Sequence, residues 1–132
     1  MRGPRNRRLL WAGAAGFALL IAGSTLSSLR GASNQADGKA LFEKRCGGCH
    51  ALDRDKEGPR LGGVYGRKAG TVDSFQYSDA LQKSKIVWAD DSLERWLTDT
   101  AKLVPDNDMT FRVESADERR AIIAYLKAVS GK

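Results

Sequence analysis

The sequence predicts a small all-α domain whose helices are joined by long ordered loops and preceded by an N-terminal apolar segment. Three stretches show the helical spacing of apolar residues, and none shows the sustained alternation that predicts strands between hairpin turns. A glycine-rich region without periodicity, from Gly58 to Thr71, separates the first stretch from the second. The predicted helices are too few to form a core alone, so we expect something else to fill the middle of the domain.

The N-terminal segment is typical of export. Residues 1–8 contain four arginines, and the 21 residues from Leu9 to Leu29 carry no charge. A helix of that length spans about 32 Å, close to one hydrocarbon core, whereas Ala22-Gly23-Ser24 offers a small-x-small cleavage pattern. We therefore predict that residues 1–30 are a signal peptide or an uncleaved signal anchor, and that residues 31–36 are a linker. The alternative, that the apolar run is a buried core helix of a soluble domain, agrees poorly with the sequence, because arginines precede the run and serines follow it.

Most of the positive charge of the chain lies in this segment. The sequence has 22 Lys and Arg against 16 Asp and Glu, a formal net charge of +6. Residues 1–30 hold five arginines and no acid, so residues 31–132 hold 17 bases and 16 acids. The domain predicted over residues 37–132 is therefore not expected to bind nucleic acid. Its two cysteines lie three positions apart, which excludes a disulfide framework.

The three helical stretches differ in how clearly they are marked. Asp37–Cys46 brings three apolar side chains within one turn, and Asp91–Thr98 spaces its apolar residues at i, i+3 and i+4. The third begins at a capping box of Ser115 and Glu118 and reaches a plausible stop at Gly131. Its apolar stripe consists of Ile122, Tyr125, Leu126 and Val129.

A short motif identifies what fills the core. Cys46-Gly47-Gly48-Cys49-His50 has the spacing of c-type haem attachment, in which both thiols add to haem vinyl groups and the histidine ligates the iron. Two thiols separated by two residues reach neighbouring vinyls of one flat ring, and the next residue then lies beneath the iron. A thioredoxin-like pair needs a βαβ setting, and zinc needs four ligands where cysteine and histidine supply three. We therefore predict one covalent haem c, attached through Cys46 and Cys49, with His50 as an iron ligand.

The second iron ligand follows by elimination. His50 is the only histidine, and both thiols would be used in thioether bonds. Methionine is the next ligand that cytochromes use, and apart from Met1 the sequence has only Met109, in the turn-rich loop over residues 105–111. The alternative is that Met109 fills a gap in the core. Beside an attached haem without a rival ligand, we predict that Met109 binds the iron.

At this point the sequence resembles the class I c-type cytochromes, the family of mitochondrial cytochrome c and its soluble bacterial counterparts. The resemblance extends from Gly38 to Leu126. Gly38 and Phe42 match the Gly-xxx-Phe of the family's first helix, which packs across the last helix at the position of Tyr125. The resemblance therefore implies the small cytochrome c fold, with its helices packed around one haem.

The resemblance also implies roles for residues around the haem. Pro59, in a match to the family's Gly-Pro-x-Leu, would accept a hydrogen bond from His50 through its carbonyl. Arg67, Tyr77 and Trp88 match the residues that surround the haem propionates. Buried carboxylates need such donors, so these assignments make physical sense.

The sequence departs from the family near the proposed site. Trp96 replaces a tyrosine whose hydroxyl reaches the methionine sulfur, so we expect Trp96 in the haem pocket with altered hydrogen bonding. The family's Pro-Gly-Thr-Lys-Met loop has Asp106, Asn107 and Asp108 at its central positions here. Asn107 can replace the threonine as a donor to a propionate. Asp108, in place of a lysine, changes the charge offered to a partner.

The resemblance and the predicted ligands imply an electron-transfer protein without catalytic residues. Iron with His and Met on its two faces has no open position for a substrate, so it cycles between two oxidation states. We expect a monomer that carries single electrons between respiratory or photosynthetic complexes, from a membrane electron donor complex to a terminal oxidase or reductase. The contacts should be small and transient, with modest salt dependence. We expect it in the bacterial periplasm, either soluble or tethered to the inner membrane through residues 9–29.

Two other functions remain as alternatives. In a five-coordinate haem sensor or a peroxidase-like enzyme, Met109 would not bind the iron, and a small molecule would take its place. The sequence offers no second histidine for acid–base chemistry, and Arg112 is the one candidate if the loop is displaced. A helical interaction module without haem would leave the Cys-x-x-Cys-His motif unexplained.

Overall fold

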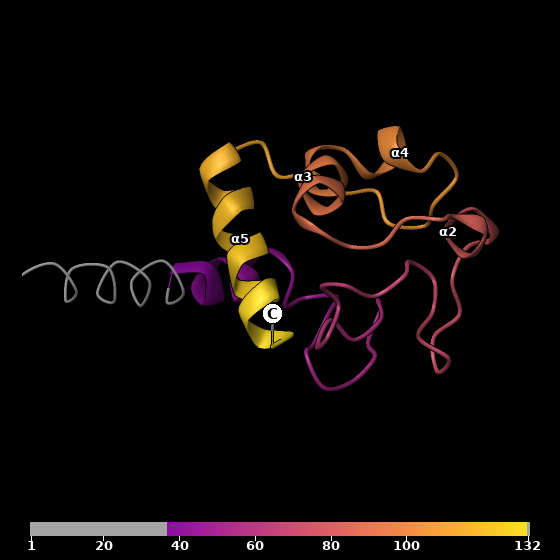
Figure 1. The fold of residues 1–132 in the computed structure, drawn as a ribbon, viewed down its shortest axis with the longest axis horizontal. Helices are drawn as coiled ribbons and strands as arrows, with labels where there is room; N and C mark the ends of the chain where they lie inside the picture. Colours follow the sequence, from indigo (N-terminus) through magenta and orange to yellow (C-terminus); the bar gives the residue numbers. More distant parts are fainter. Residues whose placement is uncertain (1–36, 132) are drawn as a thin grey trace, which may run out of the picture.

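The computed structural model describes residues 37–131, which form helices around a region of long loops (Figure 1). Residues 37–45 are helical, and the later helices are α2 (Asp79–Lys83), α3 (Asp90–Thr98), α4 (Thr100–Leu103) and α5 (Ala116–Val129). Within this part of the chain there is no strand, and one isolated bridge pairs Lys68 with Val87. The predicted all-α class is therefore confirmed.

The predicted signal or anchor segment over residues 1–30 and the linker over residues 31–36 lie outside the described residues. Among the helices that are described, none has the length and apolar character needed to cross a membrane.

All three predicted helices are present, with small differences at their ends. α3 begins at Asp90, one residue before the prediction. α5 is capped by Ser115, whose Oγ accepts a hydrogen bond from the backbone N–H of Glu118 at 3.3 Å. The reciprocal half of the predicted capping box is not formed, because the Glu118 carboxylate instead pairs with the guanidinium of Arg45 at 2.7 Å. This ion pair connects the end of the first helix to the first turn of the last.

Two further helices were not predicted, because each is too short to show an apolar period. α2 has five residues and begins after Ser78, whose Oγ accepts from the Leu81 N–H at 3.4 Å. α4 has four residues and begins after Asp99, whose Oδ1 accepts from the Lys102 N–H at 3.1 Å. In both cases a polar side chain satisfies a backbone donor of the first turn, as expected at a helix N-terminus.

The helix over residues 37–45 crosses α5, and this crossing joins the two ends of the described chain (Figure 1). The contact is close because Gly38 has no side chain: a Cβ there would lie 2.8 Å from the Cβ of Tyr125. One turn further along, the rings of Phe42 and Tyr125 lie 5.5 Å apart between centroids. Ile122 lies fully buried in the same core. The packing of Gly-xxx-Phe against the last helix is therefore present.

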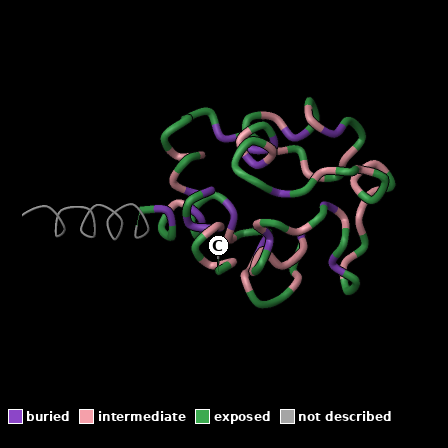
Figure 2. The backbone as a smooth tube through the Cα atoms, viewed as in Figure 1, coloured by how far each residue is buried: buried purple, intermediate pink, exposed green. Residues whose placement is uncertain are grey.

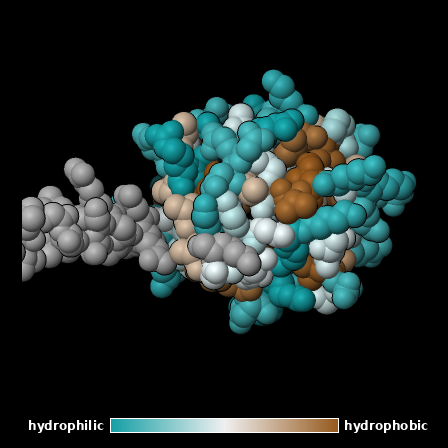
Figure 3. All heavy atoms as spheres, viewed as in Figure 1, coloured by the Kyte–Doolittle hydropathy of each residue, from teal (hydrophilic) through white to brown (hydrophobic). Residues whose placement is uncertain are grey.

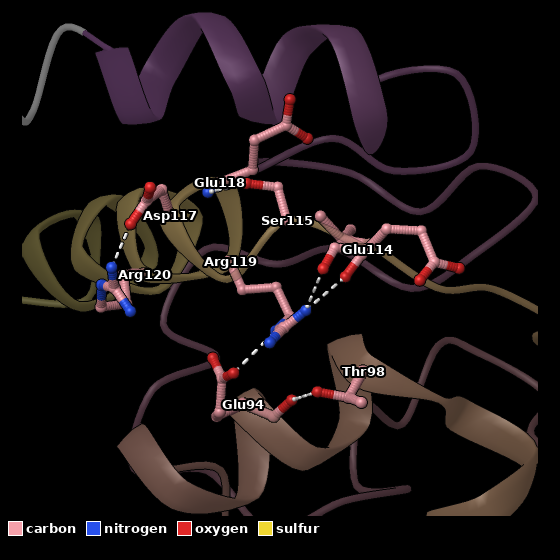
Figure 4. A network of polar contacts seen from close by, with 9 residues as sticks. Glu94, Thr98, Glu114, Ser115, Asp117, Glu118, Arg119 and Arg120 are labelled. Atoms are coloured by element: carbon pink, nitrogen blue, oxygen red, sulfur yellow. Dashed lines mark hydrogen bonds and ion pairs between the residues drawn. The ribbon is translucent and has the colours of Figure 1, made fainter.

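α5 is also fixed to α3 and to the segment that precedes it. The Arg119 guanidinium donates to the Glu94 carboxylate at 2.7 Å and to the carbonyls of Val113 and Glu114 at 2.6 and 2.9 Å (Figure 4). Buried residues alternate with exposed ones along the loops as well as on the helices (Figure 2). The loops are therefore part of the packed structure, as the sequence predicted.

Candidate haem-binding site

A cavity of about 540 Å³ lies between the loops and the helices α2, α3 and α5. This volume is in the usual range for a bound cofactor. In the view of Figure 3, apolar side chains reach the surface between α2 and α3, bordered by hydrophilic ones. All nine residues that the sequence analysis assigned to a site line this cavity: Cys46, Cys49, His50, Pro59, Arg67, Tyr77, Trp88, Trp96 and Met109.

The cysteines follow directly from the first helix. The Cys46 N–H donates to the Phe42 carbonyl at 2.8 Å, and the N–H groups of Cys49 and His50 donate to the Cys46 carbonyl at 3.1 and 2.9 Å. The motif therefore forms a tight turn that continues the helix and places both thiols at one wall of the cavity. Cys46 is buried, which raises the pKa of its thiol to about 11, whereas Cys49 is exposed. No disulfide joins the two thiols, so both can form thioether bonds.

His50 is held in one orientation and one tautomer. Its Nδ1 lies 2.8 Å from the carbonyl oxygen of Pro59. Because a carbonyl can only accept, Nδ1 carries the proton, and Nε2 keeps the lone pair that binds a metal. This is the contact that the resemblance implies for Pro59. Burial lowers the pKa of His50 below its usual value, although the hydrogen bond to Pro59 acts in the opposite direction.

Gly58 makes this position of the imidazole possible. A Cβ on Gly58 would lie 2.7 Å from Nδ1 and 2.8 Å from Nε2 of His50, well inside van der Waals contact. The imidazole ring of His50 therefore packs directly against the backbone of Gly58. In the sequence, Gly58 is only part of the Gly-Pro-x-Leu match, and its packing against His50 is visible only in the structure.

Three donors predicted for the propionates lie together along the cavity. Arg67 is half-buried, and its guanidinium donates to the carbonyls of Gly62 and Arg60 at 3.1 and 2.9 Å. Burial lowers the pKa of Arg67 and raises the pKa of Tyr77. Trp88 is buried, and its backbone N–H donates to the Arg67 carbonyl at 2.9 Å. A cation and aromatic donors at a partly buried wall suit a carboxylate ligand.

Trp88 packs against Trp96, with 5.3 Å between ring centroids. Trp96 is buried on α3, so the residue that departs from the family pattern does lie in the cavity wall.

Met109 lies in the loop that follows α4, and it is half-buried. Asp106 has a φ of 62°, the left-handed conformation that usually favours glycine. The Asn107 amide donates to the Val104 carbonyl at 2.7 Å, and its oxygen accepts from the Met109 N–H at 2.8 Å. The Asn107 side chain therefore supports the loop itself. Its amide nitrogen has a second hydrogen, so donation to a propionate stays a prediction.

The residues present fit a covalently attached haem. They supply two free thiols at the required spacing, a histidine with a free Nε2, and a cavity with an apolar wall and donors for carboxylates. Among residues 37–131, no cluster of three or more His, Cys, Asp or Glu side chains could hold a separate metal ion.

Comparison with known proteins gives the same answer for the whole domain. The family model described as cytochrome c matches residues 35–130. The chain belongs to the cytochrome c family. Cytochrome c from Euglena viridis is 43% identical over 95 residues, which are 70% of this chain and 93% of that protein. Cytochrome c2 iso-2 from Magnetospirillum molischianum is 40% identical over 97 residues, covering 71% of this chain and 99% of the relative.

A solved structure extends the similarity to three dimensions. Cytochrome cH from Methylobacterium extorquens superposes with a TM-score of 0.68 at 40% identity, covering 71% of this chain and 97% of that one. As a cytochrome c, this protein binds one covalent haem c and transfers electrons, and it is not an enzyme. The zinc and thioredoxin interpretations of the cysteines are thereby excluded.

Proposed function

We propose that this cytochrome c is a one-electron carrier in which His50 and Met109 are the two axial ligands of the haem iron. The observation that carries the proposal is their shared cavity: His50 reaches it from the turn after the first helix, and Met109 from the loop after α4. His50 has Nε2 free, and Met109 is the one thioether beyond Met1. With both ligands bound, no coordination position remains for a substrate.

Haem c supplies an iron that gains or loses one electron. The residues of the chain hold it and set its surroundings. The Pro59 carbonyl fixes the His50 ring, which makes the imidazole a stronger and better-oriented ligand. Arg67, Tyr77 and Trp88 hold the propionates, and the apolar side chains of the cavity wall exclude water. A site that keeps its ligands and geometry in both oxidation states suits rapid electron transfer.

The partners are redox proteins, and the surface near Met109 indicates how they bind. Asp106 and Asp108 are exposed in the loop over residues 105–111 that carries Met109, here called the ligand loop, and residues 31–132 are nearly neutral. We propose a membrane electron donor complex and a terminal oxidase or reductase, approached as a monomer with weak electrostatic steering. Residues 1–30 support export to the bacterial periplasm, with or without a membrane tether through residues 9–29.

Visible spectroscopy of the matured protein tests the ligand assignment. The wild type should be low-spin in both oxidation states, show a weak sulfur-to-iron band when oxidised, and bind no carbon monoxide when reduced. Met109→Ala should lose that band and bind carbon monoxide. Asp108→Ala is the matched control, because its exposed side chain lies next to Met109 in the same loop.

A high-spin wild type that binds carbon monoxide would overturn the carrier and favour the five-coordinate sensor or peroxidase. The structure offers little for that chemistry, because the Arg112 guanidinium is paired with the Asp99 carboxylate at 3.0 Å.

A further inference from the structure

Thr100 is a polar side chain buried beneath the ligand loop. It is 1% exposed, and it is the first residue of α4. Its hydroxyl donates to the Met109 carbonyl and accepts from the Phe111 N–H at 3.1 Å. Its own N–H donates to the Phe111 carbonyl at 3.3 Å. One residue therefore holds the backbone on both sides of Thr110, including the backbone of Met109 itself.

The start of α4 is in turn anchored, so Thr100 is not a mobile partner. Asp99 caps the helix through the Lys102 N–H at 3.1 Å, and its second oxygen pairs with Arg112. The Thr100 carbonyl accepts from the Val104 N–H at 3.0 Å within the same short helix. Residues 99 and 100 thus connect α4 to the backbone of Met109 and Phe111 and to the side chain of Arg112.

These contacts lie on the same stretch of backbone that carries the Met109 side chain. The Met109 side chain lines the cavity while its carbonyl lies on the Thr100 hydroxyl. A buried hydroxyl that satisfies both a carbonyl and an N–H is costly to remove, since each group is left without a partner and without water.

We propose that Thr100 is a positioning residue that clamps the ligand loop and so maintains Met109 on the haem iron. The inference rests on the proposed ligation by Met109 and adds the element that sustains it. Loss of the hydroxyl favours the open loop, in which Met109 is displaced. A competing ligand therefore binds the iron more tightly when the clamp is absent, because less free energy is spent on opening the loop.

The experiment is a titration of the oxidised holoprotein with imidazole, followed through the sulfur-to-iron band. Thr100→Val keeps the shape of the side chain and removes the hydroxyl. We expect its apparent affinity for imidazole to rise about tenfold over the wild type, the equivalent of ~1.4 kcal/mol. Thr100→Ser retains the hydroxyl, so its affinity for imidazole should lie within about threefold of the wild-type affinity.

Thr98→Val is the matched control. Thr98 lies two residues away on α3 and is exposed, and its hydroxyl donates to the Glu94 carbonyl at 2.7 Å without touching the ligand loop. It loses a hydroxyl-to-carbonyl hydrogen bond, as Thr100→Val does, but should leave the imidazole affinity unchanged. An unchanged affinity in Thr100→Val, or an equal rise in Thr98→Val, would overturn the proposal.

A second measurement needs no variant and covers the case in which Thr100→Val does not fold. In the wild type saturated with imidazole, hydrogen exchange at the Phe111 amide should become at least about tenfold faster, while the Leu126 amide on α5 remains protected. If the Phe111 amide keeps its protection, the clamp stays closed when Met109 leaves, and the inference fails. A wild type without a sulfur-to-iron band would instead reject the ligation proposal itself.

Discussion

Replacing Gly58 by alanine tests whether the imidazole of His50 depends on a bare backbone beneath it. The new Cβ would lie 2.7 Å from Nδ1 and 2.8 Å from Nε2, so the ring or the backbone must shift. Overpacking of a buried site costs about 1–3 kcal/mol. A ring that tilts away also weakens its 2.8 Å hydrogen bond to Pro59, worth about 0.5–1.5 kcal/mol. We therefore expect Gly58→Ala to lower the free energy of unfolding by about 2–4 kcal/mol.

The assay is guanidinium unfolding of the oxidised holoprotein, followed by circular dichroism and by the visible spectrum. A displaced imidazole should also leave a high-spin fraction before unfolding begins, which a purely structural defect elsewhere would not produce. Gly48→Ala is the control, because a Cβ at that position meets nothing within 4 Å. It should change stability by less than about 0.5 kcal/mol. Equal effects of the two substitutions, with both proteins fully low-spin, would refute the reasoning.

Three further predictions concern the fold and its charges. The double variant Cys46→Ala, Cys49→Ala should lose most of its helical circular dichroism, because the apolar side chains that line the cavity pack against the haem when it is bound. Native helix content without haem would contradict this. Asp106→Gly should raise stability in urea by about 0.5 kcal/mol, since glycine adopts the left-handed conformation, with its φ of 62°, without strain; a lower stability would count against it. The Ser74 hydroxyl, which donates to Asp55 at 2.6 Å, is the main reason that the pKa of Asp55 lies below its usual value. That contribution is present above the unfolded pKa and is lost as the pH falls through the folded pKa. Asp55→Asn should therefore lower the melting temperature at pH 7, and its difference from the wild type should shrink as the pH falls below the unfolded pKa. A difference that keeps its full size in acid would argue otherwise.

The sequence predicted those parts of the fold that repeat or follow a fixed spacing. The apolar stripe of α5 and the Ser115 cap are local patterns, so they predict that helix without knowledge of its neighbours. The spacing of Cys46, Cys49 and His50 is by itself enough to predict haem attachment. α2 and α4 could not be found in this way, because five and four residues do not complete enough turns to show a period.

The role proposed for Thr100 could not be predicted from the sequence. In the sequence, it is a threonine in a polar stretch and lies nine residues from Met109. Its importance arises from being 1% exposed and from the two hydrogen bonds of its hydroxyl to the ligand loop, neither of which a local pattern encodes. The same holds for Gly58, whose packing against His50 depends on how the two segments meet in space.

The crossing of the helix over residues 37–45 with α5 has a consequence for the synthesis of the protein. Gly38 and Phe42 lie in the first segment of the domain to emerge from the ribosome, and their partner Tyr125 emerges among the last. Nothing translated before α5 can cover this face of the first helix, so the core cannot close while the chain is still growing. The ends of many domains tolerate truncation, but here the last helix packs on the first, and deleting α5 would leave the helix that precedes the cysteines without its support.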